Sequence, residues 1–164
     1  MDQIYTHPKR KTKVVFVQLG SPSEPTTKAL RKYLRKFLGD PRVVDINPWL
    51  WKIILNFFVL PFRPKKSAKL YARIWDGKSF PLITNTRDFT NNVREELKKI
   101  DPNGHVEVNH AFLLSPPYVN EVYDSWEDDL KKGIGATKLL VIPMFPQYSE
   151  STIASGIDAL AKEL

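Results

Sequence analysis

Two short runs of consecutive apolar residues constrain the fold of this chain most. Residues 14–17 and 139–142 are aliphatic and aromatic throughout, as is typical of strands buried on both faces of a parallel sheet. Residues 106–112 alternate between apolar and polar side chains and predict a third strand. Residues 42–46 are a candidate for a fourth. Helical patterns separate these runs, so the sequence predicts an α/β fold of the Rossmann type, a three-layer arrangement in which helices flank a parallel sheet.

The predicted helices cover residues 28–38, 49–60, 68–75, 81–100 and 118–130, and a last one starts near residue 150. Ile153, Ile157, Leu160 and Leu164 give the last helix its apolar face, and the sequence stops inside that pattern. Three or four strands are few for a complete doubly wound domain. We therefore expect the chain to be part of a larger fold.

Charge is distributed unevenly along the chain. Residues 1–82 hold 17 Lys and Arg against 5 Asp and Glu, whereas residues 83–164 hold 8 against 13. This asymmetry favours an anionic partner, either acidic lipid, a polycarboxylate ligand or nucleic acid, and the alternative is a solvated basic surface. No nucleic-acid-binding motif is present, so we expect no nucleic acid partner. The sequence has no cysteine, which excludes disulfides and thiolate metal ligands and is consistent with a reducing cytoplasm.

Residues 48–62 form an unusually apolar segment. It contains Trp49, Trp51, Phe57 and Phe58, and a helix here has one narrow polar stripe, formed by Lys52 and Asn56. The segment is shorter than the roughly 20 residues of a membrane-spanning helix. We expect it to be helical and to expose much of its apolar surface; the alternative is a helix buried in the core. Residues 1–12 are a polar leader without the apolar stretch of a signal peptide.

The loops at the carboxyl ends of the strands are where an open α/β sheet binds ligands. The loop that contains Tyr148 and Ser149 is rich in hydroxyl groups and precedes a helix, so it is suited either to anion binding or to ordinary helix capping. His7 lies in the leader, His105 is expected to be exposed, and His110 is expected to be a hydrogen-bonded core residue. No spacing of histidines or carboxylates predicts a metal site or a catalytic set.

Several stretches resemble ferrochelatases, members of the class II chelatases. These are residues 14–22, 37–44 and 63–82, and the run Pro146-Gln147-Tyr148-Ser149-Glu150-Ser151-Thr152. The resemblance implies that residues 1–164 are the amino-terminal domain of a two-domain enzyme of haem biosynthesis. That domain would bind the porphyrin, protoporphyrin IX or coproporphyrin III, for insertion of ferrous iron. The family's catalytic histidine belongs to a carboxyl-terminal half that this sequence lacks, so the chain alone is expected to be inactive.

The resemblance also implies roles for individual residues. It assigns porphyrin binding to seven positions: Leu19, Arg63, Lys66, Tyr71, Ser79, Tyr148 and Ser149. We expect all of these except Leu19 to share one cleft, and Leu19 to lie beside the metal face of the porphyrin. It makes residues 48–62 a lip with Trp49, Trp51, Phe57 and Phe58 at the membrane surface, in a cytoplasmic protein peripheral to the inner membrane. It places no catalytic residue and no metal ligand in this half.

The resemblance bears on cofactors as well. Glu150 stands where iron–sulfur members of the family have a cysteine, so no cluster is expected. Iron and porphyrin are substrates, and no permanently bound cofactor is expected. Gln18 replaces the usual asparagine of the family, and Leu113-Leu114 replaces an Arg-Tyr pair found in some members.

Two other functions remain open at this stage. One is a short homodimeric cobalt or sirohydrochlorin chelatase, although those enzymes place a histidine at the end of the first strand, where this chain has Leu19. The other is a non-catalytic tetrapyrrole-binding module that works at a membrane surface.

Overall fold

The sheet of the computed structural model has three parallel strands in the order β2-β1-β3. The strands are β1 (Thr12–Gln18), β2 (Val106–Phe112) and β3 (Lys138–Pro143), and the structure describes residues 11–133 and 136–161. β1 lies in the middle, and Phe16 is in register with His110 on one side and Ile142 on the other. The three strands predicted from the sequence are therefore confirmed.

The predicted fourth strand at residues 42–46 is wrong. Within the described part of the chain this segment is a turn that Asp40 organises. The Asp40 carbonyl accepts the N–H groups of Val43 (3.0 Å) and Val44 (3.2 Å), and Asp40 Oδ1 accepts the Arg42 N–H (2.8 Å). Because these backbone donors bond within the turn, they are not available for pairing in a sheet.

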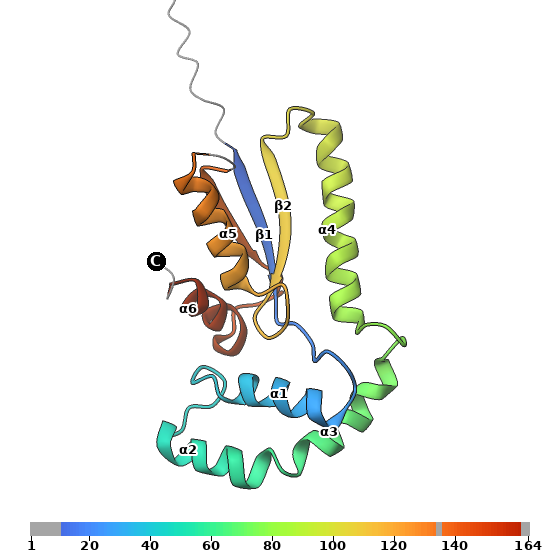
Figure 1. Cartoon of the computed structure of the whole chain (residues 1–164), viewed down its shortest axis with the longest axis vertical. Helices are drawn as coiled ribbons and strands as arrows, with labels where there is room; N and C mark the ends of the chain where they lie inside the picture. Colours follow the sequence, from blue (N-terminus) through green and yellow to red (C-terminus); the bar gives the residue numbers. More distant parts are fainter. Residues whose placement is uncertain (1–10, 134–135, 162–164) are drawn as a thin grey trace, which may run out of the picture.

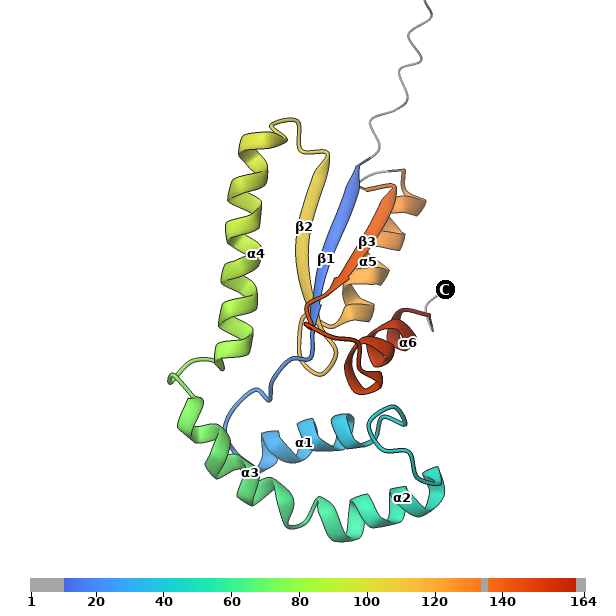
Figure 2. The same cartoon turned by 180° about the vertical axis from the view of Figure 1, so that it is seen from behind.

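Helices cover both faces of the sheet (Figures 1 and 2). α4 (Pro81–Ile100) packs on the face formed by Val14, Phe16 and Val108, whereas α5 (Val119–Lys131) packs on the opposite face. The predicted three-layer α/β arrangement is confirmed. On β3, however, Leu140 and Ile142 stay exposed, because α4 packs mainly against β2.

A helical subdomain, residues 27–74, lies beyond the carboxyl ends of the strands (Figure 1). It contains α1 (Thr27–Leu38), α2 (Pro48–Ile54), the π-helical turn η1 (Leu55–Val59), α3 (Arg63–Tyr71) and the 3-10 turn η2 (Ala72–Ile74). Its own core is formed by Leu30, Tyr33, Leu34, Leu55, Leu60 and Ala68. The chain then returns to the sheet through α4.

The final described segment is η3 (Glu150–Ala154) followed by α6 (Ser155–Ala161). Arg42 joins this segment to the turn before α2, because its guanidinium pairs with Asp158 at 2.8 Å (Nε to Oδ2). His7, Leu164 and residues 1–10 of the predicted leader lie outside the described residues. Thr12, the last residue assigned to the leader, is instead the first residue of β1.

Candidate functional site

Exposed aromatic side chains gather on the outer side of α2 and η1. Asn47 starts α2, since its Oδ1 accepts the N–H groups of Trp49 (3.1 Å) and Leu50 (3.3 Å), and Pro48 occupies the first turn. Leu55 and Leu60 pack in the subdomain core and so fix the inner side of this helical segment. Trp49 is 75% exposed, Phe57 70% and Phe58 67%. The segment is thus helical and largely exposed, as predicted.

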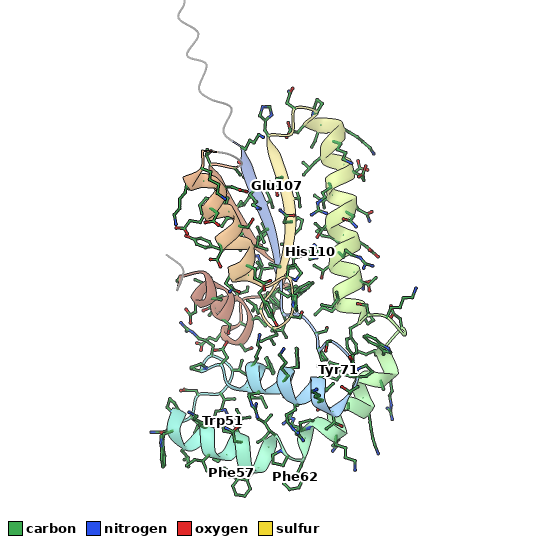
Figure 3. The ribbon with its side chains drawn as sticks, viewed as in Figure 1. Trp51, Phe57, Phe62, Tyr71, Glu107 and His110 are labelled. Atoms are coloured by element: carbon green, nitrogen blue, oxygen red, sulfur yellow. The ribbon has the colours of Figure 1, made fainter. Side chains whose placement is uncertain are left out.

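Trp51 differs from the other three aromatic residues of the predicted lip. It is partly buried against the subdomain core, and its Nε1–H donates to the Leu38 carbonyl at 2.6 Å. Figure 3 shows Trp51 on the side of α2 that faces α1, whereas Phe57 and Phe62 point away from the sheet. The expectation that Trp51 belongs to the exposed surface is therefore wrong, because α1 covers it.

The aromatic surface continues into an open hollow of about 610 Å³ between η1 and α3. Its lining combines Phe58, Phe62 and Leu70 with the cationic side chains of Arg63 and Lys66. Within the described part of the chain, neither cation has a carboxylate oxygen within 4.0 Å. We call this feature the aromatic hollow. Small-molecule sites are typically concave, largely apolar, and about 300–1,000 Å³ in volume, with a few polar groups that orient the ligand.

Tyr71 and Ser79 lie further along the chain than the aromatic hollow. Tyr71 packs edge to face against Phe80, with ring centres 5.5 Å apart, and contacts Tyr33 at 6.2 Å. Burial raises the pKa of Tyr33, and the neighbouring Tyr71 raises it further. Ser79 lines a different hollow, together with Ser21, Trp75 and Lys78. The structure therefore does not bring Arg63, Lys66 and Ser79 into one described hollow, contrary to our expectation of a single cleft.

Leu19 follows β1 at the carboxyl edge of the sheet. Its N–H donates to Gln18 Oε1 (3.0 Å), and its carbonyl accepts the Leu114 N–H (3.0 Å). Gln18 Nε2 donates to the Met144 carbonyl (3.1 Å), so one side chain joins the loops that follow β1 and β3. From the sequence, Gln18 is only a departure from the family. Its positioning role could not be predicted, because its partner Met144 lies 126 residues away.

The Tyr148–Ser149 loop follows β3 at the same edge. Tyr148 is exposed, and Ser149 Oγ lies 3.0 Å from Ser151 Oγ. The Ser149 carbonyl accepts the Ile153 N–H (2.9 Å), which starts η3, although the Ser149 side chain does not cap that turn. The Ser149 and Ser151 hydroxyl groups thus bond to each other, whereas the Thr152 hydroxyl donates to the Ser149 carbonyl (3.3 Å).

The histidines of the described residues do not form a metal site. No group of three His, Asp or Glu side chains within residues 11–133 and 136–161 could hold a metal ion. His110 is half-buried beside Phe112, and its Nδ1 has no hydrogen-bond partner in the described part of the chain, so the expectation of a hydrogen-bonded core histidine is wrong. Burial lowers the pKa of His110, and the nearby Arg94 and Arg87 lower it further. His105 is half-buried, and its Nδ1 lies 2.9 Å from Asp101 Oδ1.

No helix among the described residues is long and apolar enough to cross a membrane. Separately, Trp49, Phe57, Phe58 and Phe62 form an exposed aromatic surface. An exposed apolar patch of several large side chains usually marks a binding site for a ligand, a partner or a membrane.

The fold and this surface together define a chelatase-like α/β half-domain. The family model for ferrochelatase matches residues 11–164, so the chain belongs to the ferrochelatase family. It is similar to the ferrochelatases of Idiomarina loihiensis (42% identity over 92% of this chain) and Teredinibacter turnerae (41% over 98%). Ferrochelatase 1 of Shewanella oneidensis is 40% identical over 97% of the chain. The chain spans 40%, 43% and 46% of the length of these three relatives.

Proposed function

We propose that this chain is the porphyrin-binding amino-terminal domain of a ferrochelatase, which inserts ferrous iron into a porphyrin in haem biosynthesis. The observation that supports the proposal is the aromatic hollow, where Phe58 and Phe62 lie beside Arg63 and Lys66, two cations without a carboxylate partner among the described residues. A porphyrin has the matching chemistry, since it is a flat apolar ring that carries carboxylates.

Each part of the hollow has its own task in this proposal. The ring packs against Phe58, Phe62 and Leu70, which removes apolar surface from water. Arg63 and Lys66 bind the propionate groups and so fix the orientation of the ring. Protoporphyrin IX and coproporphyrin III both carry such groups, and both are candidate substrates.

Iron insertion also needs groups that accept the two protons of the pyrrole N–H groups. The described residues of this chain hold no cluster of His, Asp or Glu suited to a metal ion. We propose that a carboxyl-terminal half supplies the proton acceptor and the metal-side ligands, as the family resemblance implies. The chain alone would then bind porphyrin without metallating it.

The remaining aromatic side chains suit a membrane surface. Trp49 and Phe57 are exposed beyond the hollow, on the consecutive helical segments α2, which also carries Lys52, and η1. Aromatic rings and cations on one short helix favour the interface between headgroups and acyl chains. We propose that this surface holds the protein at the inner membrane from the cytoplasmic side, where an apolar porphyrin is soluble.

The proposal can be tested by titrating the chain with mesoporphyrin, a dicarboxylate, and with its dimethyl ester. The double variant Arg63→Ala/Lys66→Ala should weaken binding of the dicarboxylate about tenfold or more, because it removes charge-assisted hydrogen bonds. Binding of the ester should change little. The matched control is Lys65→Ala/Lys69→Ala, which removes the same charge from exposed positions of the same helix.

Equal losses in the two double variants would show that only the overall charge matters and would contradict the assigned roles of Arg63 and Lys66. Failure of the chain to bind either porphyrin would contradict the proposed function itself.

A further inference from the structure

A second hollow, of about 170 Å³, lies between α1 and the loops that follow β1 and β2. We call it the α1 hollow. Lys32 and Lys36 enter it from α1, one helical turn apart, and Ser21 and Ser115 enter it from the two loops. The α1 hollow and the aromatic hollow share no lining residue, so the two are separate features.

The two serine side chains are buried and have unused hydrogen-bonding capacity. Ser21 is 7% exposed and Ser115 is 8% exposed. Ser115 Oγ accepts the Ser21 N–H at 3.3 Å, and among the described residues no acceptor for the Ser115 hydroxyl hydrogen is found. Ser21 Oγ likewise has no hydrogen-bond partner within the described chain, and it is not among the fully buried unpaired atoms there, so it stays accessible from the hollow. Each hydroxyl group therefore has a donor available for an anion bound in the hollow.

The charge around these hydroxyl groups is positive. Lys36 Nζ lies 4.0 Å from the centre of the Tyr118 ring, a contact that holds the ammonium group at the hollow. Neither Lys32 nor Lys36 has a carboxylate oxygen within 4.0 Å in residues 11–133 and 136–161, and no acidic residue lines the hollow. The acid closest in sequence to Tyr118, Glu121, instead accepts the Tyr118 N–H at 2.9 Å.

We propose that the α1 hollow binds a compact oxyanion, the phosphate or carboxylate group of a small molecule, between Lys32, Lys36 and the hydroxyl groups of Ser21 and Ser115. Two ammonium groups and two hydroxyl donors provide charge-assisted hydrogen bonds to anionic oxygens. The site lies at the carboxyl edge of the sheet, where open α/β folds bind ligands. It is additional to the proposed porphyrin surface and does not depend on it.

Calorimetric titration of the whole chain tests this site, with inorganic phosphate in one series and succinate in the other. The double variant Lys32→Gln/Lys36→Gln should weaken binding of the preferred anion about tenfold or more, since it removes both cations. The control Lys28→Gln/Arg35→Gln changes the same net charge on the same helix at positions that do not line the hollow, and should change affinity less than about twofold.

Ser21→Ala gives a second test that leaves the net charge unchanged. It removes one neutral hydrogen bond and should weaken binding about threefold to tenfold, because such a bond contributes less than a charge-assisted one. A preference for phosphate or for succinate identifies the ligand class.

Three results would overturn the proposal. They are the absence of saturable binding of both anions, equal losses in the two double variants, and an unchanged affinity in Ser21→Ala. Porphyrin affinity, measured in parallel, should be the same in Lys32→Gln/Lys36→Gln and in the unmodified chain. The failure of this site is thereby distinguished from the failure of the porphyrin surface.

Discussion

The sheet buries its phenylalanine side chains, whereas three phenylalanines of the helical subdomain are exposed. In the sheet, Phe16 and Phe112 are buried, with exposures of 7% and 1%, because helices cover both faces. In the helical subdomain, Phe57 and Phe62 are 70% and 73% exposed, although the subdomain has a core of its own. Phe57 and Phe62 thus lie outside the hydrophobic core of their own subdomain. The buried set stabilises the fold, and the exposure of the second set supports the proposal that it serves binding.

The largest expected effect compares one phenylalanine from each region. Phe112→Ala should lower the free energy of unfolding by about 3–5 kcal/mol, because it leaves a cavity beside the sheet. Phe57→Ala should change it by less than about 0.5 kcal/mol, since the side chain is already in solvent. Urea denaturation of the two variants measures both values. A similar loss in Phe57→Ala would show that the exposed surface is part of the stabilising structure.

Gly20 joins β1 to the helical subdomain and should be the next most sensitive position. Its φ is +93°, and an added Cβ would overlap Ser115 Oγ and lie 3.1 Å from Phe112 Cβ. Gly20→Ala should therefore cost about 2–3 kcal/mol of unfolding free energy. Gly104, with a φ of +65° and no atom within 4 Å of an added Cβ, is the control. Gly104→Ala should cost about 1 kcal/mol, and equal losses would contradict the steric argument.

The two tryptophans of α2 allow the same comparison within one helix, with a smaller expected difference in the free energy of unfolding. Trp51→Phe removes the hydrogen bond from Nε1 to the Leu38 carbonyl and should cost about 1 kcal/mol. Trp49→Phe should cost close to nothing, because Trp49 is exposed and its ring nitrogen has no partner among the described residues. Thermal unfolding of the pair distinguishes them. A greater loss in Trp49→Phe would reverse the orientation assigned to α2.

The smallest expected effect is a pH dependence from His110. The native pKa of His110 is lowered, chiefly by burial, whereas in the unfolded chain it has its ordinary value of 6.5. The unfolded state therefore binds a proton more readily, so the free energy of unfolding should fall as the pH drops below 6.5 towards the native pKa. His110→Phe should reduce this fall, measured by urea denaturation at a series of pH values. An unchanged slope would assign the pH dependence to other groups.

The fold could be predicted from the sequence wherever a local pattern decides the structure. The apolar runs of β1 and β3 and the 20-residue pattern of α4 each identify an element without reference to the rest of the chain. The prediction of a strand at residues 42–46 fails because Asp40, which lies outside this segment, accepts its backbone N–H groups. The exposure of Leu140 depends on which strand α4 covers, which no local pattern encodes.

The candidate site was harder to predict because it depends on orientation. Residues 49–60 read as apolar on nearly all sides of a helix, and only the contact with α1 decides that Trp51 faces inward and Phe57 outward. Arg63 and Ser79 were expected in one cleft. Arg63 is the first residue of α3, however, whereas Ser79 follows η2 and lines another hollow. The α1 hollow was missed because Ser21 and Ser115 lie 94 residues apart.

The porphyrin affinity of Phe58→Ala/Phe62→Ala decides whether the exposed aromatic surface of the helical subdomain is the porphyrin site. Both side chains line the aromatic hollow and are exposed, so their loss should leave the free energy of unfolding almost unchanged. Mesoporphyrin and its dimethyl ester should both bind about tenfold or more weakly to this variant, because the apolar contact with the ring is lost for each. Unchanged affinity for both porphyrins in a stably folded variant would contradict the claim that the exposed aromatic surface of the helical subdomain is the porphyrin site.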